Sequence, residues 1–513
     1  MPPSPRPRRR SPRDRAQEQA GIPQLPWRSV VNPYAPLEVV SADQVEAIHD
    51  TSMRVLEELG IEVMSPRTVE MLAAAGAEVD RATGLVRLDR GLVAERLATV
   101  PPVFTLTPRN PDKRLTVGAN HLNFALVSGP PNVHDRVRGR RPGTFADYCE
   151  LISLAHHFNA VHMTGNQAVA PIDLPANSRH LDAYRANLTY TDMVYSCTSI
   201  GRGRALDGIA MMAIARGLTL EQMAADPAVM TVISVNSPRR FDEAMAEGLI
   251  AMAEHGQAAC VTPFTLMGAM SPVTLAAALA QQNAEALFGI VLTQVVNPGA
   301  PAVYGGFTSN VDMRSGAPAF GTPENAQANV ISGQLARRYG LPYRSTPPNA
   351  ANVADAQAAY ETQMALWGAV LGHANVLLHA AGWLEGGLVA SYEKLILDIE
   401  MLQHMMEFLR PPATGAADLG FEALRDVAPG GHFFGAAHTL ERYETAFYQP
   451  LVSDWRNSEA WADAGAEDAT RRATALWQRA LAEYRKPPLD PAVAEELDAY
   501  VARRREQIGD GEP

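Results

Sequence analysis

The stretch PAVYGGFTSNVDMRSGAPAFGTPE, residues 301–324, contains one complete unit of the pattern that decides the fold. Val303, Tyr304 and Phe307 favour a β-strand, because branched and aromatic side chains fit a pleated sheet. A long loop dotted with glycine follows, and Thr322-Pro323-Glu324 carries residues that typically begin a helix. Long loops are often functional. The unit therefore predicts a strand, a functional loop and a helix, in that order.

The same order of strand, loop and helix occurs eight times between residues 122 and 410. The strands are short and mostly apolar, as strands buried on both faces must be. They are predicted at 122–127, 160–166, 193–199, 230–237, 258–265, 301–309, 341–346 and 375–383. The helices that follow are predicted at 144–158, 177–190, 205–216, 238–255, 272–296, 323–339, 354–371 and 392–410. Eight consecutive units predict an α/β fold, a (β/α)₈ TIM barrel; an open doubly wound sheet is the alternative.

The barrel is expected to occupy residues 121–410, and three further segments surround it. Residues 30–120 predict an N-terminal α+β extension whose first helix begins at Ser41, a favourable N-cap. Residues 411–513 are expected to form a loop and helices packed on the barrel. Residues 1–29 are expected to be a disordered basic tail, because the first sixteen carry six arginines and one aspartate without the apolar core of a secretory signal.

Composition excludes several classes of protein. The net charge of −12 over 513 residues gives no overall support to nucleic-acid binding. The most apolar predicted helix, 275–296, contains Gln281, Gln282, Asn283 and Glu285, so no membrane span is expected. Three cysteines are too few for a disulfide framework. We therefore expect a well-packed cytoplasmic protein.

The predicted strands end in residues suited to binding a large polar ligand. Active sites of TIM barrels lie at the carboxyl ends of the strands. Those ends carry hydroxyls, amides, glycines and aromatic rings here, with few ionisable groups. The chain has no dinucleotide fingerprint, no phosphate loop, no zinc motif and no serine nucleophile motif. The sequence thus predicts no metal held by the protein and identifies no catalytic residue.

Four motifs carry a resemblance to a known family. They are GGFTSNVDMRSGAPAFGTPE (305–324), DAQAAYE (355–361), SYEKLILDIEML (391–402) and PGGHFFGAAHT (429–439). In this order they resemble the trimethylamine methyltransferase (MttB) superfamily, from about residue 36 to about residue 479. Members of that family are TIM barrels that move a methyl group from a methylated amine to the cobalt of a corrinoid (cobalamin) on a partner protein. Archaeal trimethylamine enzymes use pyrrolysine, whereas this chain has only standard residues and is similar to the non-pyrrolysine branch, which acts on quaternary amines such as glycine betaine.

The resemblance implies a reaction that needs little acid–base chemistry. A quaternary ammonium leaves as a neutral tertiary amine, so no general acid is required. The protein would align the methyl carbon with the cobalt, and the cofactor would supply the reactivity. The expected partners are a corrinoid-binding protein and further copies of this chain. Two alternatives stay open: direct transfer to another acceptor such as tetrahydrofolate, and a non-catalytic barrel that binds a methylated amine.

The candidate site residues follow from this chemistry. A quaternary ammonium has no N–H to donate, so aromatic faces bind it, and the carboxylate of a betaine needs cationic or N–H donors. The candidate substrate-binding residues are Tyr304, Phe307, Trp383, Arg314, His379 and His432, with Phe264, Arg344, Phe433 and Phe434 as further options. The candidate corrinoid-binding residues are Gly305, Gly306, Asn166, Ser199, Asn236 and Gly382. The alternative for the rings is packing of the barrel mouth, and for the glycines it is loop conformation.

Three acidic residues near these motifs are expected to be structural. Asp312 lies among turn residues, where an aspartate most often braces the loop. Glu393 and Asp398 lie in a predicted helix, and we expect them to hold its position unless Glu393 points into the mouth.

Overall fold

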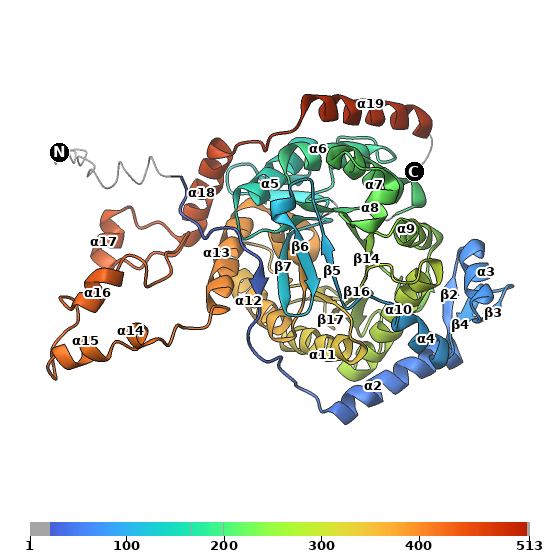
Figure 1. The fold of residues 1–513 in the computed structure, drawn as a ribbon, viewed down its shortest axis with the longest axis horizontal. Helices are drawn as coiled ribbons and strands as arrows, with labels where there is room; N and C mark the ends of the chain where they lie inside the picture. The colour runs from blue at the N-terminus through green and yellow to red at the C-terminus, as the bar shows by residue number, and fades with distance from the viewer. Residues whose placement is uncertain (1–20, 166, 199, 510–513) are drawn as a thin grey trace.

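A closed barrel of eight parallel strands forms the centre of the molecule (Figure 1). The computed structural model describes residues 21–165, 167–198 and 200–509. The main sheet runs β1-β7-β10-β11-β12-β14-β16-β19-β20, and β20 also pairs with β7, which closes the barrel. The barrel strands are β7 (His121–Leu126), β10 (Met163–Thr164), β11 (Val194–Cys197), β12 (Met230–Ile233), β14 (Ala258–Val261), β16 (Ala302–Gly305), β19 (Tyr343–Ser345) and β20 (Val376–Ala381). The predicted TIM barrel is confirmed, because an open sheet has no pairing between its first and last strands.

Helices cover the outside of the barrel, one after each strand. They are α5 (Phe145–His157), α6 (Arg179–Tyr190), α7 (Arg202–Arg216), α9 (Glu243–Glu254), α10 (Leu275–Val296), α11 (Pro323–Tyr339), α12 (Ala356–Leu371) and α13 (Tyr392–Phe408), with the short α8 (Leu220–Ala225) before β12. Thr322 caps α11 through its side chain, as the sequence predicts. The predicted start of α9 at Pro238 is wrong, because residues 237–239 form a turn, Arg240–Phe241 form a short strand and Asp242 is the N-cap.

Helix α10 is a core helix. It is the one helix in the described ranges that is long and apolar enough to cross a membrane. In its most apolar stretch, 83% of the residues are buried inside the protein. Its polar residues are bonded inside the protein, as where Thr308 Oγ1 donates to Gln282 Oε1 over 2.6 Å. Burial with satisfied polar groups is the pattern of a helix surrounded by protein.

Residues 21–29, which the sequence assigns to the tail, are bonded to helices α13 and α18 (Ala469–Glu483) on the outside of the barrel. The N–H of Ile22 donates to Glu483 and the N–H of Leu25 donates to Gln403. Strand β1 (Val30–Val31) then pairs antiparallel with β7. Trp27 packs against the hairpin of β5 (Val103–Leu106) and β6 (Leu115–Gly118), which shares one hydrophobic cluster with the barrel interior. The predicted tail boundary at residue 29 is therefore too late.

The N-terminal extension forms a small sheet and three helices beside α10. The sheet order is β13-β2-β4-β3. Its elements are α2 (Ala42–Arg54), the π-helix η1 (Val55–Leu59), β2 (Ile61–Val63), α3 (Pro66–Ala74), β3 (Glu78–Asp80), β4 (Leu85–Arg87), α4 (Arg90–Leu97) and the barrel-derived β13 (Arg240–Phe241), followed by the turn η2 (Pro111–Lys113). Ser41 caps α2 in a reciprocal capping box with Gln44.

Two small sheets extend four barrel strands beyond the barrel at its carboxyl end. The first has the order β15-β17-β18 and the second has the order β21-β22-β8-β9. Their elements are β15 (Phe264–Met267), β17 (Phe307–Val311), β18 (Pro318–Ala319), β21 (Trp383–Leu384), η3 (Glu385–Gly387), β22 (Val389–Ser391), β8 (Asn132–Asp135) and β9 (Gly139–Pro142). These rim sheets follow β14, β16, β20 and β7. Strands β10 and β11 have no rim strand in the described part of the chain.

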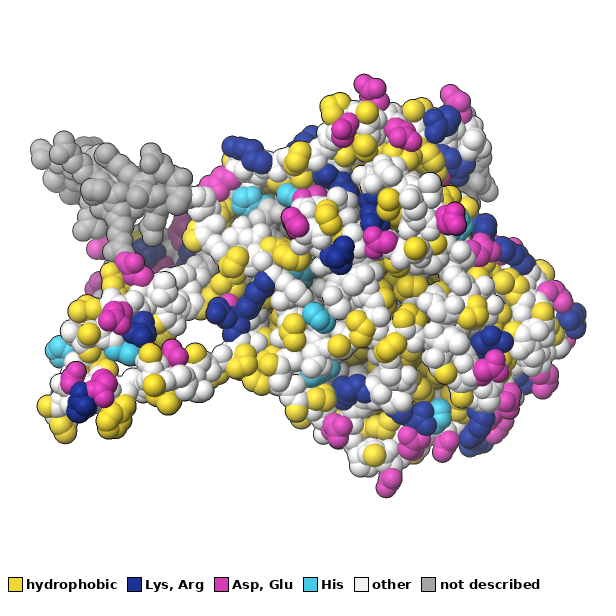
Figure 2. Space-filling view, viewed as in Figure 1, with side chains coloured by type: hydrophobic (Ala, Val, Ile, Leu, Met, Phe, Trp, Pro, Cys, Tyr) yellow, Lys and Arg dark blue, Asp and Glu magenta, His cyan; other side chains and the backbone are white. Residues whose placement is uncertain are grey.

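The C-terminal segment divides into two parts. Helices α18 (Ala469–Glu483) and α19 (Pro491–Ile508) pack on α13 and on α6 and α7. Residues 411–450, here called the arm, instead project from the barrel and carry exposed apolar side chains (Figures 1 and 2). The helices here are α14 (Ala416–Leu419), α15 (Phe421–Asp426) and α16 (Ala437–Arg442), with α17 (Ser458–Asp463) after the arm. The arm departs from the expectation that residues 411–513 pack on the barrel.

Candidate active site at the carboxyl end of the barrel

The barrel interior changes from apolar to polar toward the carboxyl ends of its strands. Away from the carboxyl ends, side chains of alternate strand residues fill the barrel interior in one hydrophobic cluster. Its members are Ala125, Met163, Val194, Met230, Ala258, Cys260, Val303, Val376 and Leu378. Near the carboxyl ends, the hydroxyl groups of Thr198, Thr265 and Thr346 are buried and have no hydrogen-bond partner among the described residues. Buried polar atoms are normally paired. This end of the barrel therefore has the character of a binding surface.

Arg344 on β19 is a buried cation without an acid. Its side chain is 1% exposed, and no carboxylate of the described residues pairs with it. Its Nη1 donates to the carbonyl of Gly306 over 3.3 Å, its Nε has no partner, and its guanidinium lies 5.2 Å from the centre of the Phe307 ring. Burial lowers the pKa of Arg344 to about 10, so the group is still charged at neutral pH. A buried charge without a counter-ion is unfavourable, and such a residue is suited to binding an anionic group.

Five rings gather beside Arg344, here called the aromatic cluster. Phe307 is at its centre, with ring centroids 4.9 Å from Phe264, 5.6 Å from Phe320, 6.1 Å from Trp383 and 6.2 Å from His379. Trp383 and His379 are 4.5 Å apart. Phe307 and Trp383 remain 8% and 7% exposed. The predicted residues Phe307, Trp383 and His379 are thus brought together.

His379 is held neutral in a strained position. Its φ is +60°, at the irregular pairing of β20 with β7 between residues 377 and 381. Its Nδ1 accepts the N–H of Ser128 over 3.2 Å, which assigns the proton to Nε2. Burial, and then the charge of Arg344, hold the pKa of His379 well below its ordinary value. The ring offers an N–H to a ligand but not a positive charge.

Trp383 is fixed by a second layer of contacts. Its Nε1 donates to the carbonyl of Asn349 over 3.0 Å, and Asn349 Nδ2 donates to the carbonyl of Trp383 over 2.7 Å. The preceding Gly382 donates its N–H to Asp398 Oδ2 over 2.8 Å, and Asp398 forms a buried ion pair with Lys394. Asp398 is therefore structural, as expected from the sequence, and it positions the segment that presents Trp383.

Tyr304 faces away from the aromatic cluster. It is fully buried, Gln282 Nε2 on α10 donates to its hydroxyl over 3.3 Å, and its ring lies near Tyr339 on α11 and Tyr343. Val303 points into the barrel interior, and side chains alternate along a strand, so Tyr304 points outward. Its position does not support a contact with substrate.

The space beside the three glycines predicted to approach a corrinoid, Gly305, Gly306 and Gly382, is occupied by other protein atoms. A Cβ on Gly305 would meet Thr262 Oγ1 at 1.9 Å, and one on Gly306 would meet Ser332 at 3.0 Å. Gly382 has a φ of +97°. Packing and backbone conformation explain all three.

The other predicted cofactor residues give no common surface. Asn236 lies exposed in a turn, where its backbone exchanges hydrogen bonds with Arg240. Asn166 and Ser199 lie outside the described residues.

Arg314 and His432 lie away from the aromatic cluster. Arg314 is exposed in the loop between β17 and β18, which Asp312 braces by accepting the Ser315 hydroxyl over 2.6 Å. His432 is exposed in the arm and packs near Phe434, with ring centroids 5.7 Å apart. Asp312 therefore braces its loop, as expected.

The choice of residues from the sequence omits Phe320 and leaves Arg344 among the further options. Phe320 is 1% exposed and enters the aromatic cluster from the end of the long loop, which no strand pattern places. For Arg344 a signal was present, because LPYRST places an arginine inside a strand predicted to be buried. A charge at such a position calls for a specific role.

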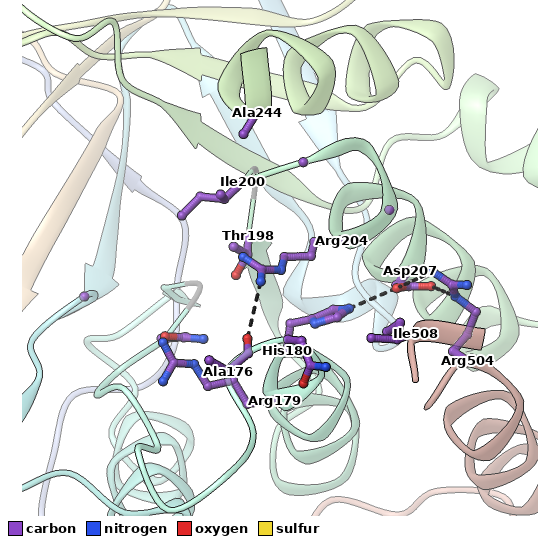
Figure 3. Close-up of a pocket in the computed structure, with 15 residues that line it drawn as sticks. Ala176, Arg179, His180, Thr198, Ile200, Arg204, Asp207, Ala244, Arg504 and Ile508 are labelled. Carbon is purple, nitrogen blue, oxygen red and sulfur yellow. Dashed lines mark hydrogen bonds and ion pairs between the residues drawn. The ribbon is translucent and has the colours of Figure 1, made fainter. Parts of the chain in front are cut away.

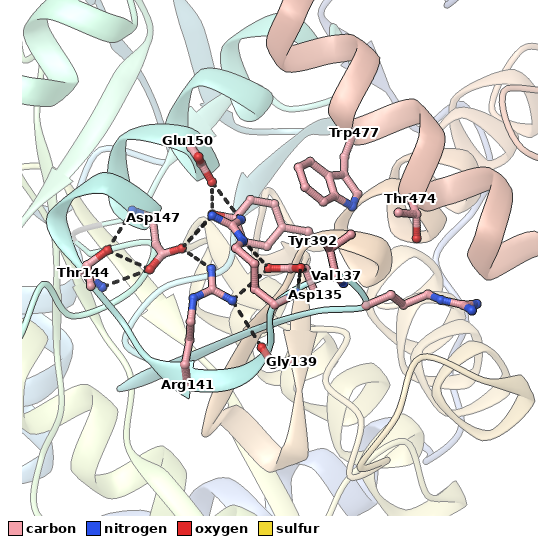
Figure 4. Close-up of polar contacts among 12 residues, drawn as sticks. Asp135, Val137, Gly139, Arg141, Thr144, Asp147, Glu150, Tyr392, Thr474 and Trp477 are labelled. Atoms are coloured by element: carbon pink, nitrogen blue, oxygen red, sulfur yellow. Dashed lines mark hydrogen bonds and ion pairs between the residues drawn. The ribbon is translucent and has the colours of Figure 1, made fainter.

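A charged network ties the second rim sheet to the helices (Figure 4). Asp135 accepts from Arg138 and Arg141 over 2.8 Å each, and Arg141 also pairs with Asp147. The Tyr392 hydroxyl donates to Glu150 over 2.6 Å. The network fixes the rim of the mouth and leaves its charges paired, in contrast to Arg344.

Glu393 belongs to the same region and is structural. It is buried, and its Oε1 accepts from Trp477 Nε1 over 2.9 Å and from Thr474 Oγ1 over 2.8 Å. These contacts join α13 to α18.

A closed (β/α)₈ barrel with an unpaired cation and clustered rings at its carboxyl end has the architecture of a TIM-barrel enzyme. Within the described residues, no three His, Cys, Asp or Glu side chains are grouped so as to hold a metal ion. The sequence model of the trimethylamine methyltransferase (MTTB) family matches residues 6–509. The chain belongs to this family, and the family predicted from the motifs is confirmed.

Named relatives cover nearly the whole chain. The chain is 35% identical over 473 residues to a glycine betaine methyltransferase of Desulfitobacterium hafniense strain Y51, covering 92% of this chain and 98% of that one. It is 26% identical to the trimethylamine methyltransferase MttB of Desulfitobacterium hafniense strain DSM 10664 / DCB-2, with coverages of 91% and 94%. It is 25% identical to a proline betaine:corrinoid methyltransferase of Eubacterium limosum, with coverages of 90% and 96%. These relatives are methyltransferases, which supports the prediction of an enzyme.

A similar solved structure is that of the monomethylamine methyltransferase MtmB of Methanosarcina barkeri. It is 10% identical, with a TM-score of 0.48, and the likeness covers 87% of this chain and 93% of that one. The barrel follows from the strand pairing alone.

Proposed function

We propose that the chain transfers a methyl group from a quaternary amine that also carries a carboxylate, a betaine, to the Co(I) of a corrinoid on a partner protein. The observation that carries the proposal is the position of Arg344. Its buried guanidinium has no carboxylate partner among the described residues and lies against the aromatic cluster. The two features complement the two ends of a betaine. The names of the relatives from Desulfitobacterium hafniense strain Y51 and Eubacterium limosum, which act on glycine betaine and proline betaine, support the same substrate class.

The rings supply the ammonium end of the site. A desolvated cation on an aromatic face gains about 0.5–2 kcal/mol for each contact. The rings of the cluster pack against one another, at 4.5–6.2 Å between centroids, so the ammonium group would bind to the ring surfaces that they leave open. Phe264 is only half-buried and offers the most accessible phenylalanine ring of the cluster.

Arg344 supplies the carboxylate end. A guanidinium binds a carboxylate through paired N–H donors, and its Nε has no partner in the protein. A substrate without a carboxylate, such as trimethylamine, would leave the buried charge uncompensated. We therefore expect discrimination in favour of betaines.

The side chains at the mouth align the substrate and exclude water. The leaving group is a neutral tertiary amine that needs no proton, so a neutral His379 is compatible with the reaction. When bound, the corrinoid supplies the cobalt nucleophile. The contribution of the chain is the fixed direction of the N–methyl bond, set by Arg344 at one end and the rings at the other.

The unpaired hydroxyls at the strand ends fit a corrinoid. The corrin ring is edged with amide groups, which donate and accept hydrogen bonds. Thr198, Thr265 and Thr346 have buried hydroxyls able to pair with such amides. We infer that these residues, more than the predicted glycines, would contact the cofactor.

The arm supports the expectation of a homo-oligomer. Leu419, Phe421, Phe434 and Phe447 are between 64% and 81% exposed. Exposed apolar groups of this density mark interaction surfaces. A corrinoid protein and further copies of the chain are the proposed partners, and the cytoplasm is the proposed location.

The test is methyl transfer in vitro. The protein is mixed with a Co(I) corrinoid protein and, in turn, glycine betaine, proline betaine, choline and trimethylamine. We expect loss of the Co(I) absorbance and formation of the demethylated amine with a betaine. No change with any compound would contradict the proposal. Turnover with tetrahydrofolate in the absence of corrinoid would favour the direct acceptor, and tight binding without product would favour a binding protein.

A further inference from the structure

A cavity lies beside the barrel mouth, on the side of β10 and β11, which carry no rim strand in the described residues (Figure 3). Its volume is about 740 Å³. It is formed by the carboxyl ends of β7, β10 and β11, the first turns of α6 and α7, and the end of α19. Gly129 lines it, and the neighbouring Ser128 donates its N–H to His379 of the aromatic cluster. The cavity therefore adjoins the proposed active site.

The lining of the cavity carries an excess of positive charge. Arg179, Arg204 and Arg504 line it, and Asp207 is the one acidic residue among the lining residues. The carboxylate of Asp207 already pairs with Arg504 Nε, at 2.5 Å, and with His180 Nε2, at 2.9 Å. Three arginines against one aspartate leave two uncompensated charges.

Arg179 and Arg204 are those two charges. Arg204 donates to the carbonyl of Ala176 over 3.3 Å and has no carboxylate partner within the described ranges. The structure gives the Arg179 side chain no partner there either. Burial, and the nearby charge of Arg179, lower the pKa of Arg204. Two adjacent cations without an acid are unfavourable unless an anion joins them.

The backbone adds donors at the same place. Helix α7 has 15 residues and begins after Gly201, whose φ is +92°, with no side chain capping its first turn. Helix α6 has 12 residues and also lacks a side-chain cap. The free N–H groups and dipole of an uncapped helix start favour anions.

Two buried polar atoms of the lining also lack partners. The Oγ1 of Thr198 is buried without a hydrogen bond in a residue that is 6% exposed, and the same holds for Nδ1 of His180, which is 3% exposed. Both residues line the cavity (Figure 3). These atoms are independent of the helix starts and of the arginines.

The geometry points to a phosphate-binding site in this cavity, in which Arg179, Arg204, the first turn of α7 and the Thr198 hydroxyl bind the phosphate of a ligand at the barrel mouth. The chemistry is that of a phosphate mono- or diester, which accepts several charge-assisted hydrogen bonds at once. The source is either a separate phosphorylated molecule or the phosphodiester in the nucleotide tail of a corrinoid; only the second rests on the proposed function.

The first experiment measures binding of inorganic phosphate to the full chain by calorimetry at low salt. We expect one saturable site. Arg179→Gln and Arg204→Gln should each weaken binding at least tenfold. The matched control is Arg503→Gln, which removes the same charge from an exposed position on α19 outside the lining. It should change binding less than twofold.

Thr198→Val separates binding from folding. The lost hydroxyl has no partner among the residues that the structure describes, so the melting temperature should not fall while phosphate binding weakens. No saturable binding, or equal weakening by Arg503→Gln and Arg204→Gln, would overturn the proposal.

Competition identifies the source of the phosphate. Displacement of phosphate by cobalamin but not by cobinamide, which lacks the nucleotide tail, would identify the corrinoid. Displacement by neither, with saturable phosphate binding intact, would identify a separate phosphorylated ligand. Both readouts are independent of methyl transfer, so failure of the proposed function and failure of the phosphate site are distinguishable.

Discussion

Replacing Arg344 by methionine should remove betaine binding without weakening the fold. Methionine keeps an unbranched side chain of similar reach and removes the charge. Most buried charges are paired, and removal of one partner then costs about 3–5 kcal/mol of stability. Arg344 differs, because it is buried without an acid.

The magnitude follows from its surroundings. Burial lowers the pKa of Arg344 from 12.5 to about 10, which corresponds to a penalty of about 3 kcal/mol for keeping the charge. The hydrogen bond to Gly306 and the contact with Phe307 offset about 1 kcal/mol each. The variant should therefore be unchanged in its free energy of unfolding or gain about 1 kcal/mol.

Binding should change in the opposite direction. Loss of a buried charge pair with the substrate costs about 2–5 kcal/mol, or roughly 30-fold to several thousand-fold in Kd. Calorimetry with glycine betaine and with tetramethylammonium, which lacks a carboxylate, provides the comparison. Only glycine betaine should bind more weakly. The matched control Arg314→Met removes an exposed arginine and should leave the stability and the binding of both ligands unchanged.

Two results would refute the reasoning. A loss of 3 kcal/mol or more in denaturant unfolding would show that the Arg344 charge is already compensated within the protein. Equal weakening of glycine betaine and tetramethylammonium would show that Arg344 does not bind the carboxylate.

Three further predictions concern the rings, a buried histidine and an ion pair. Phe307→Leu removes the aromatic face but keeps most of the volume, so betaine Kd should rise about 2- to 30-fold while stability falls by less than about 1.5 kcal/mol. His162 is buried just before β10, where its Nδ1 accepts the N–H of Phe124. Burial lowers its pKa to about 4, so between pH 6.5 and pH 4 the unfolded chain binds a proton there and the folded chain does not; stability present above pH 6.5 should fall by about 2 kcal/mol by pH 5, and less in His162→Asn. Asp398→Ala leaves Lys394 buried and unpaired and should cost about 3–5 kcal/mol, which Lys394→Met in the same chain should largely restore.

Each of these three predictions has a result that would contradict it. Unaltered betaine affinity in Phe307→Leu would assign the ring to packing. Equal pH dependence of unfolding in wild type and His162→Asn would remove His162 as the titrating group. A double variant no more stable than Asp398→Ala would show that the ion pair does not compensate the Lys394 charge.

The sequence could predict the barrel because its signals are local. Short apolar strands, glycine-rich strand ends and helix caps such as Thr322 recur with a fixed order, and tertiary packing agrees with them. The helix start at Pro238 is misplaced because Arg240 and Phe241 pair with Glu62 and Val63 of the N-terminal sheet, a contact between segments distant in sequence.

The site could be predicted only in part, and the reason is orientation. Phe307 and Tyr304 are both aromatic, but Val303, Gly305 and Phe307 are two residues apart and share the inner face, whereas Tyr304 faces α10. The sequence alone could have predicted this alternation of side-chain direction. The position of Phe320, which comes from a loop, and the lack of a carboxylate partner for Arg344 among the described residues depend on the folded chain, so the sequence alone could not predict them.

The uneven rim has a consequence for delivery of the methyl acceptor. Sheets stand above β14 and β16 on one side and above β20 and β7 on another, while the sector over β10 and β11 has no such wall in the described residues. Within the described ranges, the sector from β10 to β12 is the widest part of the mouth without a rim sheet, so we expect the proposed corrinoid protein to approach from this side. Its footprint would fall on α6, α7 and α19, so complementarity between the two proteins should be sought on these helices and not evenly around the ring.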